Sequence, residues 1–454
     1  MSETNATSSP SSPQSSESSR RQFLQTAGAT AAGAMLINSA LSSAVYAQGN
    51  DTIKIGLIGC GGRGTGAAAN ALHAHPANKL VAMGDLFIDK ITGTDKRPGS
   101  LPALISQEGN AQIDVPKDRQ FAGWDAYKGV IEASDVVLLA TTPHFRPLHI
   151  EACLNAGKHI FAEKPVGVDA KSVRKVMELS KAAAEKKINL VSGLCYRYDK
   201  YVKETVEQIH SGKIGDVVSI NSNYLTGWLW NNPRQPQWSD MEYQIRNWLY
   251  YYWLSGDHVV EQHIHSLDKA LWIMNNEPPT HVISTGGRQQ RTAPEFGNIY
   301  DHFANVFEWI RPGQAPVRVF SYCRQFTGQP TVTVDVSDLI FGTEGVASLD
   351  QHRITDRHGK VTWKRSPTTP ENMYDSEHKA LFGAIRAGEV LNNGDYMCKS
   401  TLMGIMARES AYSGKKITWE EIMKSDQDLS PEGGYQWEKL PVAPVAVPGE
   451  YKFK

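Results

Sequence analysis

The stretch IKIGLIGCGGRG, Ile53–Gly64, decides how this chain begins to fold. Its first half, Ile53–Ile58, is a short apolar run that is typical of a buried parallel strand. Its second half supplies a G-x-G-x-x-G loop, made of Gly59, Gly61, Gly62, Arg63 and Gly64. Glycines in such a loop let backbone N–H groups approach a pyrophosphate, with the N-terminus of a helix behind it. The stretch therefore predicts a dinucleotide-binding loop, and a glycine turn without a ligand is the alternative.

The residues that follow supply the rest of a nucleotide-binding unit. Thr65–His73 is rich in alanine and predicts a helix, and Leu80–Gly84 predicts a second strand. Asp85 ends that strand, 21 residues after Gly64, where a carboxylate holds the 2′-hydroxyl of a ribose. Because Asp85 would repel a 2′-phosphate, the sequence favours NAD, while Lys90 keeps NADP as the alternative.

Strands and helices alternate through the first half of the chain, which predicts a doubly wound parallel sheet. Further strands are expected at Val136–Ala140, His159–Ala162 and Asn189–Leu194. Helices are expected at Arg146–Ala156 and Lys171–Lys187. The least regular part, residues 88–119, predicts an insertion.

From residue 217 onward, longer strands suit an antiparallel or mixed sheet. They are expected at Val217–Tyr224, His281–Gly286, Ala304–Trp309, Arg318–Cys323 and Thr331–Phe341, and a helix at Met397–Ser413. The proline-rich end predicts an extended arm. We therefore expect a leader (1–47), a dinucleotide-binding domain (48–167), a second α/β domain (168–426) whose first helix and strand (171–194) complete the preceding sheet, and the arm (427–454).

The leader is typical of an export signal. SRRQFLQ, Ser19–Gln25, places twin arginines before a stretch of small residues, which is the pattern of folded-protein export, and VYA suits cleavage near Ala47. We expect an exported, periplasmic protein that uses the twin-arginine machinery, with an uncleaved membrane anchor as the alternative. The net charge of −1 gives no basis for a nucleic-acid partner. Five scattered cysteines predict free thiols.

The stretch TTPHFRPLHIEACLNAGKHIFAEKP, Thr141–Pro165, resembles the signature of the Gfo/Idh/MocA oxidoreductases. The resemblance extends over residues 53–417 and implies an N-terminal Rossmann domain and a C-terminal α/β domain with a large, mostly antiparallel open sheet. It implies that Lys164 is an active-site lysine beside the nicotinamide, and that a cis bond precedes Pro165. We add Thr141, Pro143, His144, Glu163 and Lys164 to the expected cofactor-binding residues.

A second cluster lies in SGDHVVEQHIHSLDKALW, Ser255–Trp272. The family pattern places an aspartate, a histidine and an aspartate where this chain has Glu261, His265 and Asp268. On one helix these three side chains would form a single stripe that aims an acid–base pair at the substrate. We expect His265 to be the base or proton relay and Glu261 to orient it or bind substrate. The alternative is a buried histidine with only a structural role.

The same cluster raises the question of a metal site. Asp257, His258, Glu261 and His265 would share a helix face, but the zinc pattern H-x-x-E-H fails at Gln262. We therefore expect no metal, and we count Asp257 and Asp268 among the substrate-site residues.

Aromatic residues gather between the two clusters. Trp228 and Trp230 lie among glycine, asparagine and proline, which predicts a loop. Flat aromatic faces beside polar groups suit a sugar ring, although a core or subunit interface is the alternative. Tyr196 and Arg197 follow a strand where the family lines its pocket, so we add them to the substrate side.

Together these features predict hydride transfer between a nicotinamide cofactor and a sugar, cyclitol or related hydroxy or keto compound. Because the periplasm offers little free NAD, the cofactor is expected to be bound tightly before export and recycled in place. The alternatives are an NAD-dependent glycosidase that acts by transient oxidation and elimination, and a sugar-binding protein without turnover. The open sheet implied by the resemblance also predicts a homodimer or homotetramer.

Overall fold

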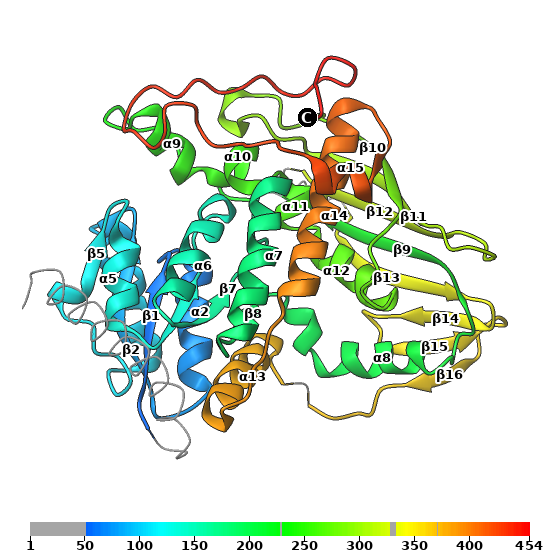
Figure 1. Ribbon diagram of the computed structural model, residues 1–454, viewed down its shortest axis with the longest axis horizontal. Coiled ribbons are helices and arrows are strands. Elements are labelled where there is room, and N and C mark those ends of the chain that lie inside the picture. The colour runs from blue at the N-terminus through cyan, green and yellow to red at the C-terminus, as the bar shows by residue number, and fades with distance from the viewer. Residues whose placement is uncertain (1–50, 228, 327–332, 370) are drawn as a thin grey trace, which may run out of the picture.

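The computed structural model describes residues 51–227, 229–326, 333–369 and 371–454. The expected leader with its cleavage site, and Trp228, lie outside the described residues. The described chain forms two large sheets that lie side by side, with helices between them (Figure 1). The α/β fold class expected from the sequence is confirmed.

The first sheet is parallel, with the strand order β5-β2-β1-β6-β7-β8. Its strands are β1 (Ile53–Ile58), β2 (Asn78–Asp85), β5 (Gln120–Ala122), β6 (Val136–Leu139), β7 (His159–Ala162) and β8 (Leu190–Ser192). The order reverses between β1 and β6, and sheets of this kind bind ligands at the carboxyl ends of the strands beside such a reversal.

Helices cover both faces of this parallel sheet (Figure 1). They are α2 (Gly62–His73), α3 (Ile88–Thr92), α4 (Ser100–Glu108), α5 (Ala126–Ala133), α6 (Arg146–Asn155) and α7 (Ala170–Glu185). The expected insertion contains α3, α4 and a short hairpin of β3 (Gly93–Thr94) and β4 (Arg97–Pro98). It lies beside β2 and therefore at the edge of the expected nucleotide site.

The second sheet has nine strands in the order β16-β15-β14-β13-β9-β12-β11-β10-β17. They are β9 (Val217–Thr226), β10 (His281–Gly287), β11 (His302–Trp309), β12 (Val317–Gln325), β13 (Asp335–Gly342), β14 (Gly345–Ser348), β15 (Arg353–Asp356), β16 (Val361–Lys364) and β17 (Ile417–Thr418). Only the β9–β12 pair is parallel, so the expected mostly antiparallel sheet is confirmed. Residues alternate between the two faces, as in β12, where every second side chain is buried.

One buried helix joins the two halves of the molecule. The helix α14 (Gly394–Ser413) contacts α7 on one side, and α12 (Ile264–Ile273) and β10 on the other. Nearly all of its residues are buried, so it has no solvent-facing polar stripe. The helix α13 (Met373–Ala387) then packs back on α2. These contacts hold the two sheets in a fixed relation, with the functional site between them.

The remaining elements lie at the top of the molecule in Figure 1 or connect the two sheets. They are α8 (Lys200–His210), α9 (Asp240–Arg246), α10 (Tyr252–Ser255), α11 (His258–Glu261) and α15 (Trp419–Lys424). Beyond α15 the expected C-terminal arm has neither helix nor strand and runs over α9 and α10. All five cysteines are free and buried. No helix within the described ranges has the length and apolarity that a bilayer span needs.

Buried histidines make the fold sensitive to acid. Burial lowers the pKa of His144 and His159 to about 4, and that of His149, His263 and His378 to about 3. In the unfolded chain these histidines bind protons near pH 6.5, whereas in the folded chain they stay neutral down to about pH 4 or 3. Their contribution to stability is therefore fully present above pH 6.5 and is lost as the pH falls below it. Each histidine contributes a slope of up to about 1.4 kcal/mol per pH unit.

We therefore expect Tm, measured by differential scanning calorimetry, to fall steeply between pH 6.5 and pH 4.5. His378 has no hydrogen-bond partner on either ring nitrogen among the described residues, and its ring packs at a tilt against Phe161 with ring centroids 4.2 Å apart. The His378→Leu variant should therefore show a shallower loss of stability with acid than the wild type. A Tm that stays constant down to pH 4.5 would contradict this account.

Candidate functional site

The glycine loop forms an open backbone cradle at the start of α2. Gly59 has a φ of +95°, and a Cβ there would lie 2.5 Å from the backbone of Ala140 and Thr141. A Cβ on Gly64 would lie 1.9 Å from the carbonyl oxygen of Gly59. Nothing lies within 4 Å of the Cβ positions of Gly61 and Gly62, so the backbone there is free to approach a ligand. With the N-terminus of α2 behind it, the loop fits a pyrophosphate.

Asp85 fixes the neighbouring strand end to this loop. Its carboxylate accepts hydrogen bonds from the backbone N–H of Cys60 at 2.7 Å and of Phe87 at 3.0 Å. Burial raises the pKa of Asp85, and these two N–H groups partly offset that effect. Lys90 and Arg97 lie on the wall of the same cleft. Asp85 therefore stands where the carboxylate of a nucleotide-binding unit is expected, with two cations nearby.

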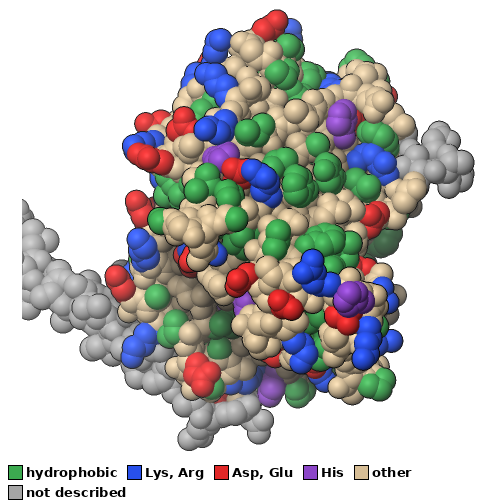
Figure 2. Space-filling view, turned by 90° about the vertical axis from the view of Figure 1, so that its right-hand side faces the viewer, with side chains coloured by type: hydrophobic (Ala, Val, Ile, Leu, Met, Phe, Trp, Pro, Cys, Tyr) green, Lys and Arg blue, Asp and Glu red, His purple; other side chains and the backbone are tan. Residues whose placement is uncertain are grey.

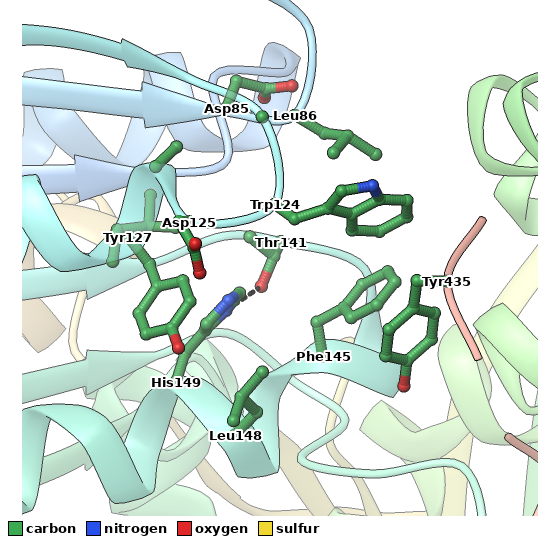
Figure 3. A pocket seen from close by; sticks show the side chains of 13 residues that line it. Asp85, Leu86, Trp124, Asp125, Tyr127, Thr141, Phe145, Leu148, His149 and Tyr435 are labelled. Carbon is green, nitrogen blue, oxygen red and sulfur yellow. Dashed lines mark hydrogen bonds between the residues drawn. The ribbon is translucent and has the colours of Figure 1, made fainter. Parts of the chain in front are cut away.

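Two cavities meet at Asp85. The larger, of about 640 Å³, extends from the glycine loop past Lys164 to Glu261 and His265. The smaller, of about 220 Å³, is mostly apolar, and it shares Asp85, Leu86, Thr141 and Phe145 with the larger one. Figure 3 shows its aromatic wall and the hydrogen bond, 3.2 Å long, between Thr141 Oγ1 and His149 Nδ1. An elongated ligand with an aromatic end fits this pair of cavities.

Lys164 stands at the inner end of the larger cavity. Its Nζ donates to the carbonyl oxygen of Glu261 at 2.7 Å and to Glu261 Oε1 at 3.2 Å. Both side chains are about 15% exposed, so the pair is largely enclosed but reachable from the cleft. The peptide bond between Lys164 and Pro165 is cis, as the resemblance implied. Lys164 is thus a cation held at a defined point of the cavity wall.

His265 lies beside this ion pair in an aromatic setting. Tyr196 meets its ring edge-on at 5.3 Å, and Tyr224 stacks on it at 6.4 Å. Burial, and then the charges of Lys164 and Lys269, lower the pKa of His265 well below its ordinary value. The imidazole is therefore uncharged at neutral pH, so one ring nitrogen can accept a hydrogen bond, and the same surroundings make it a weaker base than a free histidine. Its Nδ1 has no hydrogen-bond partner within the described part of the chain.

The expected single helical stripe is wrong in its geometry. Helix α11 ends at Glu261 and α12 begins at Ile264, so Glu261 and His265 belong to different helices. The side chain of Gln262 at the break accepts hydrogen bonds from Thr226 at 3.2 Å and Gln325 at 2.7 Å. The break still leaves Glu261 and His265 lining the same cavity, while Asp268 is turned away from it.

Three residues expected on the substrate side lie in the interior instead. Asp268 is 1% exposed and forms a two-pronged ion pair with Arg197, whose Nε and second guanidinium nitrogen lie 2.9 and 2.8 Å from its two oxygens. Asp257 accepts hydrogen bonds from the backbone N–H of Tyr300 at 2.8 Å and from the hydroxyl of Tyr412 at 2.6 Å. These three side chains hold elements together and do not line the cleft.

Only some of the residues expected to bind the cofactor line the larger cavity. Thr141, Glu163 and Lys164 line the larger cavity, whereas Pro143 and His144 do not. His144 Nε2 instead lies 2.7 Å from the hydroxyl of Tyr435 in the C-terminal arm. Pro143 begins the short 3₁₀ turn that precedes α6 and is buried.

Arg63, which the sequence assigns to the cofactor loop, lines the larger cavity. Its Nε lies 2.9 Å from Glu163 Oε1, and its guanidinium lies over the ring of Tyr374 at 4.7 Å. Sequence reasoning missed several other residues of the wall, which are Asn232, Ile245, Arg246, Trp248 and Tyr374. The density of aromatic residues after Trp228 was the only signal for part of this group. No three or more His, Cys, Asp or Glu side chains are placed to hold a metal ion in the part of the chain that the structure describes.

Comparisons with known proteins agree with this arrangement. Residues 53–193 match the GFO_IDH_MocA model, an oxidoreductase family with an NAD-binding Rossmann fold, and residues 206–381 match the C-terminal α/β domain of the same family. Residues 17–36 match the twin-arginine translocation signal.

Two curated relatives are inositol 2-dehydrogenases. That of Rubrobacter xylanophilus is 28% identical over 254 residues, which cover 56% of this chain and 60% of the relative. That of Rhizobium meliloti is 27% identical over 304 residues, which cover 66% and 77%. Scyllo-inositol dehydrogenase from Lactobacillus casei, solved with NAD(H) and scyllo-inositol, shares the fold at a TM-score of 0.58 and 18% identity, covering 81% of this chain and 99% of that one. The chain belongs to the Gfo/Idh/MocA family of NAD(P)-dependent oxidoreductases.

Proposed function

We propose that this chain transfers hydride between a nicotinamide cofactor and a hydroxyl-bearing carbon of a sugar or cyclitol. One observation carries the proposal: Lys164, Glu261 and His265 converge in the same cavity that begins at the glycine loop and Asp85. The loop fits a pyrophosphate, so a dinucleotide bound there would extend toward these three side chains. The inositol dehydrogenases among the relatives support the substrate class.

The chain's own groups have distinct tasks in this reaction. When bound, the nicotinamide accepts or returns the hydride. Glu261 holds Lys164 Nζ through two contacts, and Lys164 can then donate a hydrogen bond to the reacting oxygen. Neutral His265 takes the hydroxyl proton as the carbonyl forms and returns it in the reverse direction. Arg63 and Glu163 bind each other under the glycine loop and orient its start.

Aromatic side chains in the cleft support a ring-shaped substrate. Trp230 and Trp248 both line the larger cavity, and their ring centroids are 6.3 Å apart. Asn232 lies on the same wall. Apolar C–H faces of a sugar pack on such rings, while hydroxyl groups bind the amide and the charged groups. Of the two tryptophans expected beside the sugar, Trp230 lines this cavity, whereas Trp228 lies outside the described residues.

The export signal supports a retained cofactor. The match over residues 17–36 indicates export of a folded protein, and we propose a periplasmic location with cleavage near Ala47, or an uncleaved anchor as the alternative. A folded protein can carry a dinucleotide with it, whereas a freely exchanging cofactor would be lost outside. We propose tightly bound NAD, with NADP as the alternative because Lys90 and Arg97 lie in the cleft.

The outer face of the nine-stranded sheet supports a homodimer or homotetramer. Among the described residues, the helices that pack on this sheet lie on its inner face, and the outer face carries apolar side chains from several strands, including Ile283, Tyr322, Phe341 and Val361. Figure 2 views the side that carries this sheet and shows apolar groups gathered across its middle, with charges around them. A second copy of the chain presents the same face of apolar and charged side chains, so two such faces can pack against each other.

Native mass spectrometry and absorbance test these proposals together on the protein recovered from the exported compartment. We expect one dinucleotide per subunit, an assembly of two or four subunits, and a nicotinamide absorbance change when inositols or aldoses are added. Protein that neither contains nor takes up a dinucleotide would refute the proposed function. Bound cofactor with no spectral change would point to a sugar-binding protein, and glycoside cleavage without net redox change would point to the glycosidase.

A further inference from the structure

The C-terminal arm lies over the smaller cavity and is fixed on both sides of it. Before the crossing, the backbone N–H of Leu429 donates to Asp169 at 3.2 Å, and Asp428 pairs with Lys171 at 2.9 Å. After it, the carbonyl oxygen of Leu440 accepts from Gln244 of α9 at 2.7 Å. The segment between these two anchors therefore has a defined path across the Rossmann domain.

Two aromatic residues of this segment close on the Rossmann domain. Tyr435 stacks on Trp124 with centroids 5.3 Å apart and meets Phe145 edge-on at 5.2 Å. Trp437 stacks on the same Trp124 at 4.9 Å and contacts Phe87 at 5.8 Å. Figure 3 shows Tyr435 facing Trp124 and Phe145 from a separate part of the chain. The arm thus forms one wall of the smaller cavity.

A hydrogen bond fastens this wall. The hydroxyl of Tyr435 lies 2.7 Å from His144 Nε2, in the turn between β6 and α6. Burial lowers the pKa of His144 to about 4, so at neutral pH its ring is uncharged. The ring also bonds to the backbone of Trp253, which leaves Nε2 to accept from Tyr435. His144 therefore connects the turn, the 253 region and the arm.

The α9 region closes the same end of the cleft. Arg246 holds Asp89 through two contacts of 3.0 and 2.9 Å, and its guanidinium lies 3.8 Å from the ring centroid of Phe87. Phe87 lies two residues after Asp85 and donates its backbone N–H to that carboxylate, so this contact stands next to the group that the sequence assigns to the cofactor ribose. Arg246 of α9 and Trp437 of the arm therefore meet at the ring of Phe87, at this end of the cleft.

We infer that the C-terminal arm is a clasp that keeps the adenosine end of the dinucleotide in place, with Tyr435 and Trp437 as its contacts and His144 as its catch. This inference rests on the proposed function, because it takes the ligand of the two cavities to be a dinucleotide. The clasp slows release of the cofactor without taking part in the chemistry. It offers a physical basis for the retention that an exported oxidoreductase needs.

Release of NADH from the full mature chain tests the clasp. The fluorescence of bound NADH is followed after mixing with excess NAD, for the wild type and for Trp437→Ala and Tyr435→Phe. Loss of the Trp437 stacking should speed release about tenfold, and loss of one hydrogen bond in Tyr435→Phe about threefold. Val442→Ala is the matched control, because Val442 is an exposed side chain of the same arm.

The outcomes separate the clasp from the function on which it rests. Faster release in both variants with an unchanged rate for Val442→Ala supports the clasp. Unchanged release in variants that bind NADH would overturn it and leave the proposed function standing, whereas a wild type that binds no NADH would overturn both. If Trp437→Ala does not fold, Tyr435→Phe decides, since it keeps the ring and loses only the hydroxyl.

Discussion

Replacing Lys164 with methionine is expected to lower kcat about 10³-fold while leaving the chain folded and loaded with cofactor. Methionine keeps the length and apolar stem of the side chain but removes the cation that Glu261 holds at 2.7 and 3.2 Å. A positioned proton donor or acceptor contributes about 10²–10⁴-fold to a rate. In the proposed function the glycine loop and Asp85 bind other parts of the cofactor, so binding should be affected far less than turnover. Steady-state kinetics with the substrate found by the absorbance screen measures the effect.

Two controls make this result specific. Lys424→Met removes an exposed lysine of α15, far from the cleft, and should leave kcat unchanged. Cofactor content, measured by absorbance of the denatured protein, should match the wild type in the Lys164 variant. Residual activity within tenfold of the wild type would show that Lys164 only shapes the cavity.

The parts of the site that the sequence predicted are those that a short local motif encodes. Gly59 and Gly64 have no room for a Cβ, and this requirement appears in the sequence as spacing alone. Asp85 ends a strand, and Lys164 precedes a proline in a specific triplet. In each case a few neighbouring residues determine both the backbone and the position of the side chain, and all four residues line the larger cavity, while their roles toward cofactor and substrate stay predictions.

The parts that the sequence did not predict depend on contacts between distant segments. His144 and Tyr435 are 291 positions apart, and no pattern near either residue indicates their hydrogen bond. At the helix break after Glu261, the side chain of Gln262 accepts hydrogen bonds from Thr226 of β9 and Gln325 of β12. Both strands belong to the nine-stranded sheet, and neither is near Gln262 in the sequence. Helical periodicity describes an isolated helix, and here tertiary hydrogen bonds override it.

Arg197 and Asp268 show how a charged pair can resemble a ligand site in sequence. In the structure they satisfy each other, and Ser400 Oγ donates to Asp268 Oδ1 at 2.7 Å. The guanidinium also lies over Tyr396 at 3.9 Å and Trp272 at 5.1 Å from the ring centroids. Every one of these contacts stabilises the junction of α12 and α14, so the pair belongs to the core.

Replacing Arg197 with methionine is therefore expected to destabilise the protein rather than weaken substrate binding. The variant leaves the Asp268 carboxylate buried and unpaired, which costs about 3–5 kcal/mol of unfolding free energy. Equilibrium denaturation in urea measures the loss, and the substrate KM of the folded fraction should stay at the wild-type value. The double variant Arg197→Met, Asp268→Leu should regain much of the stability, because no charge is then left without a partner. A raised KM with unchanged stability would contradict this account and would indicate that Arg197 and Asp268 bind substrate.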